Sequence, residues 1–199
     1  MLSGTDLKSI AQKLAHQLRL PGYHLLVLLG FSILAVFLTY PLAFVDNTSI
    51  VGTDIARKDG WQKIWDLWWL RQSLLEGHPL LQSSYIFWPL GVSLLVYQTY
   101  ALTTLLLSMP VLLPFGPVAA YKFSMIINFA LSGYTMFLLA WYYTRRQSAA
   151  LVAGAIFMAA PMHLSRFADG SHLNAMQWLP IYLLLLALWL EHGRIWQGA

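Results

Sequence analysis

The sequence has no cysteine, and only 10% of its 199 residues are charged. Without thiols the chain cannot form a disulfide, a cysteine-ligated zinc site or a cysteine nucleophile. Soluble domains usually carry about 25% charged residues, and a surface this poor in charge would not keep a protein dispersed in water. Hydrophobic residues make up 58% of the chain. The composition therefore predicts a membrane protein.

Charge is missing from long runs, and these runs have the length of transmembrane helices. About 20 apolar residues cross the ~30 Å hydrocarbon core of a bilayer. Four runs contain no charged residue, namely 25–45, 123–144, 147–165 and 173–190. A fifth run, 92–114, is interrupted by Pro110 and Pro114. We predict an all-α polytopic integral membrane protein with four or five transmembrane helices, in which residues 92–199 form a helical bundle.

Residues 1–22 precede the first apolar run and combine leucines at helical spacing with scattered lysine and arginine. This pattern predicts an amphipathic helix on the membrane surface, which ends at Pro21 and Gly22. Positive charge favours the cytoplasmic side of a membrane. We therefore expect a multi-pass protein of the inner or plasma membrane with a cytoplasmic N-terminus. Residues 23–45 would form the first transmembrane helix, and residues 46–91 would lie outside.

The predicted outer loop, residues 46–91, is acidic and rich in tryptophan. It holds five of the eight acidic residues: Asp46, Asp54, Asp59, Asp66 and Glu76. Asp59 can act as an N-cap for an outer-face amphipathic helix over 60–76. One side of that helix would carry Trp61, Ile64, Trp65, Trp68 and Leu75, and the other Gln62, Lys63, Asp66 and Ser73. Because tryptophan favours the bilayer interface, we expect this helix to lie along the outer membrane surface with its charged side toward water.

The path of residues 92–114 decides which loops share a side of the membrane. If this run crosses, Arg145 and Arg146 lie outside and residues 166–172 lie inside. If it dips in and returns, the two arginines lie inside, and residues 166–172 lie outside beside the acidic loop. The tendency of positive charge to stay inside favours the second arrangement.

The first candidate site consists of Asp54 and Asp59, with Arg57 and Lys58 between them. A carboxylate at the boundary of water and lipid can act as general base on an acceptor hydroxyl. Alternatively, Asp54 and Asp59 can hold a divalent cation, Mg²⁺ or Mn²⁺, against a diphosphate. The two cationic side chains would then offset phosphate charge. On spacing alone, a solvated loop in which Asp59 only caps a helix is an alternative.

The second candidate site consists of Arg166, Asp169, His172 and Asn174, followed by Gln177. Ionisable groups near membrane depth are candidate functional residues, and here they are expected to contribute to substrate binding. An ordinary charged turn between two transmembrane helices explains the same pattern. The net charge of +4 is spread too thinly for a nucleic-acid surface, so we expect no nucleic-acid partner.

An ordered series of segments resembles a known family. An acidic loop after the first span is followed by DGWQKIWDLWW, by YIFWPLGVSLL, and by LSGYTMFLLAWYYTRRQSAALVAGAIFMAAPMHLSRFADGSHLNAMQWLPIYLLLL. Over residues 30–191 this series resembles the N-terminal half of bacterial polytopic glycosyltransferases of the GT-C superfold. Such enzymes transfer a sugar from a lipid-phosphate carrier to an acceptor on the outer membrane face.

The resemblance implies that an aspartate of the first outer loop is the catalytic base or a metal ligand. Asp59, directly before GWQ, matches this position best, and Asp54 is the second candidate. His172 and Asn174 match a GHLN-like segment of these proteins. The resemblance further implies two partners, namely membrane lipids and a sugar donor linked to a lipid phosphate.

Two functions remain open. The first is that of a glycosyltransferase, or of the N-terminal module of one. The second is that of a non-catalytic transmembrane subunit of a larger membrane protein complex. The second is considered because the chain is shorter than the enzymes it resembles. Its small residues also allow tight packing of helices against other membrane subunits. A transporter ranks last, because neither charged groups at mid-membrane nor inverted repeats are found.

Overall fold

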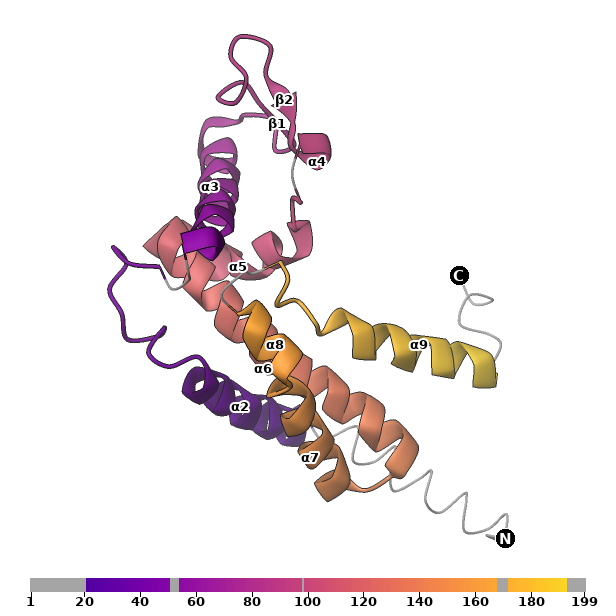
Figure 1. The fold of residues 1–199 in the computed structure, drawn as a ribbon. Helices are drawn as coiled ribbons and strands as arrows, with labels where there is room; N and C mark the ends of the chain where they lie inside the picture. The colour runs from indigo at the N-terminus through magenta and orange to yellow at the C-terminus, as the bar shows by residue number, and fades with distance from the viewer. Residues whose placement is uncertain (1–20, 51–53, 98, 168–171, 193–199) are drawn as a thin grey trace, which may run out of the picture.

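The computed structural model describes residues 21–50, 54–97, 99–167 and 172–192, and these are mostly helical (Figure 1). The helices are α2 (Pro21–Leu38), α3 (Asp54–Glu76), α4 (Leu94–Tyr97), α5 (Leu102–Phe115), α6 (Pro117–Thr144), α7 (Gln147–Met158), α8 (Pro161–Arg166) and α9 (Trp178–His192). Strands β1 (Gln82–Ser83) and β2 (Val92–Ser93) form an antiparallel pair in which Ser83 lies opposite Val92. The all-α fold class is confirmed for the described residues. The predicted N-terminal helix lies outside them, apart from Pro21 and Gly22, which begin α2.

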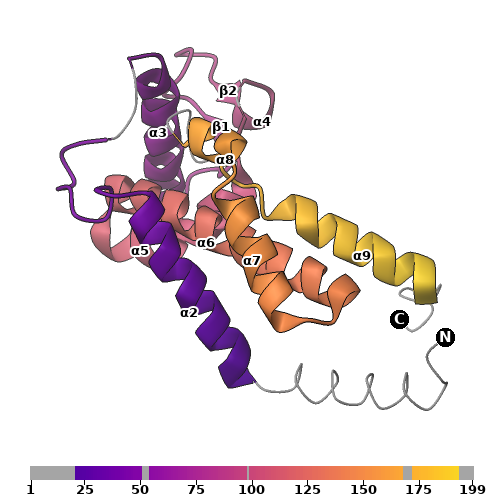
Figure 2. The ribbon, with the colours of Figure 1, turned by 60° about the horizontal axis from the view of Figure 1, so that its bottom comes forward.

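Helix α6 is the centre of the fold, and α2, α3, α5, α7 and α9 all pack against it (Figures 1 and 2). With 28 residues it is about 42 Å long. Small side chains such as Ala120 and Ala130 are fully buried on it, so its neighbours can approach closely. The other helices are therefore positioned by their contacts with α6.

Helices α2 and α6 run antiparallel. At one end, Lys122 on α6 donates a hydrogen bond to the carbonyl of Val45, just after α2. Near the start of α2, Nδ1 of His24 lies 3.0 Å from the hydroxyl of Tyr134, which is three turns further along α6. The end of α2 and the start of α6 thus lie together, and we call this the acidic end because Asp46 and Asp59 are there.

A tight turn joins α6 to α7. Arg145 adopts the left-handed conformation (φ 57°), and its N–H donates to the carbonyl of Trp141. Further along, Gly154 of α7 packs on Gly133 of α6. A Cβ atom at Gly154 would lie 2.5 Å both from the Gly133 carbonyl oxygen and from the ring of Phe31 on α2. Three helices therefore meet at a point where only glycine fits.

Two helices among the described residues are long and apolar enough to cross a membrane: Pro117–Thr144, and Gln147–Arg166, which comprises α7 and α8. The apolar helices at 22–38, 102–115 and 178–190 are shorter. The predicted spans 25–45 and 173–190 were thus too long as helices. Turns follow Leu38, because Pro41 disfavours helical backbone before it.

Helix α5 does not carry the chain to the other end of the bundle. Its 14 residues span about 21 Å, and α6 begins directly after Gly116, which has φ 85°. Because α2 ends where α6 begins, the chain between them returns to the same end. Arg145 and Arg146 lie at the opposite end of the bundle. Which side of a membrane each end occupies stays a prediction. The predicted domain boundary at residues 91 and 92 falls inside the β1–β2 hairpin.

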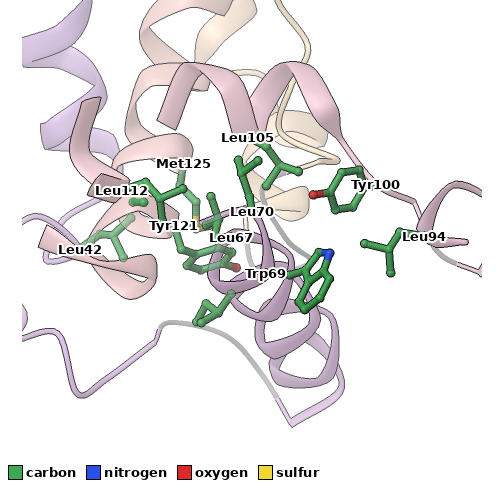
Figure 3. Packing of buried hydrophobic residues seen from close by; sticks show 12 residues of the cluster. Leu42, Leu67, Trp69, Leu70, Leu94, Tyr100, Leu105, Leu112, Tyr121 and Met125 are labelled. Atoms are coloured by element: carbon green, nitrogen blue, oxygen red, sulfur yellow. The ribbon is translucent and has the colours of Figure 1, made fainter. Parts of the chain in front are cut away.

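Helix α3 extends beyond the end of the bundle and carries the β1–β2 hairpin and α4 at its far end (Figure 1). The predicted division of its faces is wrong. Lys63, Asp66 and Ser73 are 2%, 0% and 3% exposed, whereas Trp61 and Leu75 are 52% and 61% exposed. Lys63 and Asp66 share a helical face with Leu67 and Leu70, which pack on α5 and α6. Figure 3 shows this hydrophobic core.

The start of α3 also differs from the prediction. The helix begins at Asp54 rather than at residue 60, so Asp59 lies within the helix and is not its N-cap. The intervening Ala56, Arg57 and Lys58 are good helix formers, so nothing local interrupts the helix before Gly60. Gly60 is buried against Tyr121, and this packing offsets its weak helix propensity.

Candidate active site at the acidic end

Lys122 anchors the loop that follows α2. Its side chain is 5% exposed, and its ammonium group donates hydrogen bonds to the carbonyl oxygens of Val45, at 2.9 Å, and of Asp46. A buried cation is stable only where such acceptors replace its water. The loop is thereby held against the first turns of α6, where α3 also packs.

Asp46 is an exposed carboxylate in this loop. Its Oδ1 accepts hydrogen bonds from the Thr48 hydroxyl, at 2.6 Å, and from the Thr48 N–H, at 3.2 Å. These bonds, together with the nearby positive charge of Lys122, lower the pKa of Asp46 below its usual value. Asp46 is therefore ionised at neutral pH, and its oxygens are already used in a local turn.

Asp59 is exposed and lies in the second turn of α3. Gly60, next to it, brings α3 close to α6, because a Cβ there would lie 3.3 Å from the Tyr121 hydroxyl. The charge of Asp59 is near enough to act on the same phenol. Asp46 and Asp59 thus flank Lys122 and Tyr121, which are adjacent on α6, and two carboxylates gather at the acidic end.

The other residues of the first candidate site are placed only through their backbone. Asp54, Arg57 and Lys58 lie in the first turns of α3, and their side chains are outside the described part. Positions five residues apart on an α-helix are about 140° apart around its axis, so Asp54 and Asp59 do not share a face. A divalent cation at Asp59 therefore needs further oxygen ligands, such as those of a diphosphate.

Metal binding at this end stays a prediction. Among the residues that the structure describes, no three His, Cys, Asp or Glu side chains gather in one place. Magnesium commonly uses only one or two carboxylates and completes its shell with water and substrate phosphate. Asp59 fits such a role, because its carboxylate is exposed to an incoming ligand.

A buried ion pair lies on the same face of α3, one and two turns beyond Asp59. Lys63 Nζ is 3.0 Å from Asp66 Oδ2, and the two side chains are 3% and 0% exposed. Lys63 also donates to the carbonyl of Thr99, just before α5. Burial and the negative charge of Asp66 raise the pKa of Tyr100 to about 12. The pair ties α3 to the segment that leads into α5.

Sequence reasoning missed this pair because it assigned all charge on α3 to water. The signal was present, since Lys63, Asp66, Leu67 and Leu70 recur at the spacing of one helical face. Opposite charges three residues apart on an apolar face indicate a buried pair rather than a solvated side. Asp59 shares that face but stays exposed.

The second candidate site divides into an exposed and a buried part. Arg166 is exposed at the end of α8, His172 is half-buried, and Asn174 is fully buried. Asp169 lies outside the described residues. The side-chain amide of Gln177, also buried, donates to Oδ1 of Asn128 on α6 at 3.0 Å. Gln177 therefore belongs to the packing of the start of α9 on α6, whereas the Asn174 carbonyl contacts His163 on α8.

His163 is a buried polar residue that sequence reasoning did not select. Its ring stacks on Phe129 of α6, with centroids 3.9 Å apart. Its two nitrogens each lie 3.1 Å from a backbone carbonyl, of Met158 and of Asn174. A neutral imidazole donates to only one of them. His163 thus fixes the turn before α8 to the segment before α9.

Phe167, directly after α8, packs against both hydrophobic cores. One is the core of α3, α5 and the start of α6, and the other is the core between α2, α6 and α7. Arg166, its neighbour, is therefore at the acidic end as well.

No protein-family model, curated protein or solved structure matches this chain. The resemblance noted in the sequence therefore stays an expectation, and function is inferred from the residues.

Proposed function

We propose that this chain is a membrane-embedded glycosyltransferase, or the N-terminal module of one, with its active centre at the acidic end. The observation that supports this is the exposed carboxylate of Asp59, which lies next to the close contact of Gly60 on α3 with Tyr121 on α6. Asp59 is exposed there, whereas Asp66 is buried and paired with Lys63. Asp59 is thus the carboxylate of this face that can meet a substrate.

In the proposed reaction Asp59 is the general base. Its carboxylate takes the proton of an acceptor hydroxyl while that oxygen attacks the anomeric carbon of the donor sugar. The bond from that carbon to the carrier phosphate breaks, and the electron pair leaves with the phosphate oxygen. Positive side chains stabilise this developing charge, and Arg57, Lys58 and Arg166 are the candidates for this role.

The proposed membrane arrangement follows from the helix directions. Helix α6 and the segment 147–166 would cross the bilayer, and the exposed leucines of α2 and α9 suit contact with lipid. Arg145 and Arg146, at the opposite end, would face the cytoplasm. The acidic end would then lie outside the inner or plasma membrane, and the N-terminus inside.

The test is sugar transfer by membranes that contain the whole protein. Polyprenyl-phosphate-linked hexoses serve as donors, and transfer to endogenous acceptors is measured for the wild type, Asp59→Asn and the control Asp46→Asn. Loss of a general base should reduce the rate by about 10²–10⁴-fold. The control should keep most of the wild-type rate, because the Asp46 carboxylate is held by hydrogen bonds within its own turn, to Thr48 and Ser49. Equal rates for Asp59→Asn and wild type would refute the assignment.

A second candidate function is that of a non-catalytic subunit in a membrane complex. The hairpin and α4, beyond the end of the bundle, expose large apolar side chains: Phe87 58%, Leu90 92%, Leu95 58% and Val96 87%. Apolar patches of this kind commonly mark protein contacts. Purification in mild detergent with mass determination separates the two functions. A stable complex of unrelated subunits, whose formation and activity are unchanged by Asp59→Asn, would favour the role of a non-catalytic subunit.

A further inference from the structure

A cavity lies between the last turns of α3 and the β1–β2 hairpin. It has a volume of about 360 Å³ and is lined by Trp69, His78, the serines of both strands and residues next to them. Gly91 (φ 69°) lets the hairpin close, because a Cβ there would lie 3.0 Å from the carbonyl oxygen of Ser83. A second cavity of about 390 Å³ adjoins it, and both include His78 and Ser84. Sites for small molecules usually have about 300–1,000 Å³.

The lining combines aromatic rings with neutral hydrogen-bonding groups. Trp69 is buried, and the parallel rings of Trp65 and His78 lie against it, with centroids 6.0 and 5.6 Å away. The aromatic rings open to a ligand are those of Tyr85 and Trp88, which line the adjoining cavity and are 63% and 78% exposed. Hydroxyl and amide groups come from Ser83, Ser84, Ser93 and Gln82. Among the described residues that line the two cavities, none is Asp, Glu, Lys or Arg.

One polar group in the lining lacks a protein partner. Trp69 is 2% exposed, and within the described part of the chain its indole Nε1 has no hydrogen-bond acceptor. Figure 3 shows this nitrogen on the ring edge that points toward Leu94, the residue after Ser93. That nitrogen is enclosed by protein atoms, so the polar groups that a ligand can reach are those of exposed lining residues such as Gln82 and Ser84.

The chemistry of this lining selects the ligand. An anion would find no lysine or arginine among the described lining residues, and the one imidazole there, that of His78, already lies 2.9 Å from the Glu76 carboxylate. A purely apolar ligand would displace water from the exposed Gln82 and Ser84 side chains without replacing its hydrogen bonds. A sugar ring matches both features, because its C–H face packs on aromatic rings and its hydroxyls donate to and accept from neutral groups.

We propose that this cavity binds a neutral saccharide unit. The proposal rests on the proposed function, since it supplies a subsite for the glycan that takes part in transfer. Trp69 is ten residues beyond Asp59 on α3, about 15 Å along the helix. The cavity therefore holds a more distant saccharide unit of the same glycan rather than the reacting sugar or its direct neighbour.

The test uses the purified full chain in nanodiscs and a panel of neutral mono- and disaccharides. Binding is measured by saturation-transfer NMR and tryptophan fluorescence, with gluconate as the charged comparison and indole as the flat aromatic one. Gln82→Leu removes an exposed amide of the lining, and Gln147→Leu, at the start of α7, is the matched control. Ser84→Ala is the second lining variant, in case Gln82→Leu fails to fold.

We expect saturable binding of at least one neutral saccharide, weakened about tenfold by Gln82→Leu and unchanged by Gln147→Leu. Asp59→Asn should abolish transfer yet leave this binding intact, which separates the two proposals. Saccharide binding without any effect of Asp59→Asn on transfer would remove the proposed reaction but not the site. Absence of saturable saccharide binding, tighter binding of indole, or insensitivity to both lining variants would overturn the site.

Discussion

Replacing Asp66 by leucine is expected to destabilise the protein by about 3–5 kcal/mol, because the Lys63 ammonium then stays buried without its counterion. The side chains of the pair are 3% and 0% exposed, so water cannot replace the lost partner without opening the packing of α3. The carbonyl of Thr99 would remain as an acceptor for Lys63, but it carries no full charge.

The magnitude follows from the geometry of the pair. At 3.0 Å and an effective dielectric constant of about 20, the attraction is about 5–6 kcal/mol. Burial of each ion costs several kcal/mol, so the intact pair contributes little net stability. Lys63→Met with Asp66→Leu removes both charges and should therefore be more stable than Asp66→Leu alone, by about 2 kcal/mol or more.

The assay is equilibrium unfolding in detergent micelles, followed by the fluorescence of the tryptophans on α3. Glu76→Gln is the control, because Glu76 is a carboxylate at the end of the same helix whose contacts with Gln72 and His78 are exposed to solvent. It should change stability by less than about 1 kcal/mol. A cost below about 1 kcal/mol for Asp66→Leu, or a double variant as unstable as the sum of the single ones, would refute a buried ion pair.

Two further predictions concern packing and pH. Gly154→Ala should cost about 1–3 kcal/mol in the same assay, because its Cβ would lie 2.5 Å from the Gly133 carbonyl and from Phe31. The control Gly30→Ala, whose Cβ would have nothing within 4 Å, should be neutral or stabilising. Equal costs for the two variants would contradict the close approach of the helices at Gly154. The pKa of Tyr100 is raised from 10.0 to about 12. The unfolded chain therefore loses its proton first, and stability should fall as pH rises from 10 toward 12. Tyr100→Phe should reduce that fall in thermal unfolding at alkaline pH; an unchanged fall would mean that the phenol is not buried.

The helices could be predicted from the sequence because they depend on local pattern. The apolar runs 123–144 and 147–165 coincide closely with α6 and with α7 and α8, since length and lack of charge suffice to identify them. The run 25–45 was only partly correct, because Pro41 ends the helix early. The predicted start of α3 was wrong, because Asp59 was taken as the N-cap and the helix already begins at Asp54.

The site depended on contacts that no local pattern reveals. Whether Lys63 and Asp66 face water is decided by the approach of Thr99, which is distant in sequence. The turn between α5 and α6 decides which loops share an end of the bundle. The role of His163 depends on its contacts with Phe129 and with the carbonyl of Asn174. The residues next to His163 in the sequence do not predict these contacts.

The most direct test of the account is the sidedness of the two candidate sites. The sequence has no cysteine, so single cysteines can be introduced at Ser49, Ser165 and Ser148, all of which are exposed. Intact cells are treated with a membrane-impermeant maleimide, before and after permeabilisation. We expect Ser49→Cys and Ser165→Cys to react in intact cells, and Ser148→Cys, at the start of α7, only after permeabilisation. Reaction of Ser49→Cys and Ser165→Cys from opposite sides would contradict a shared outer site.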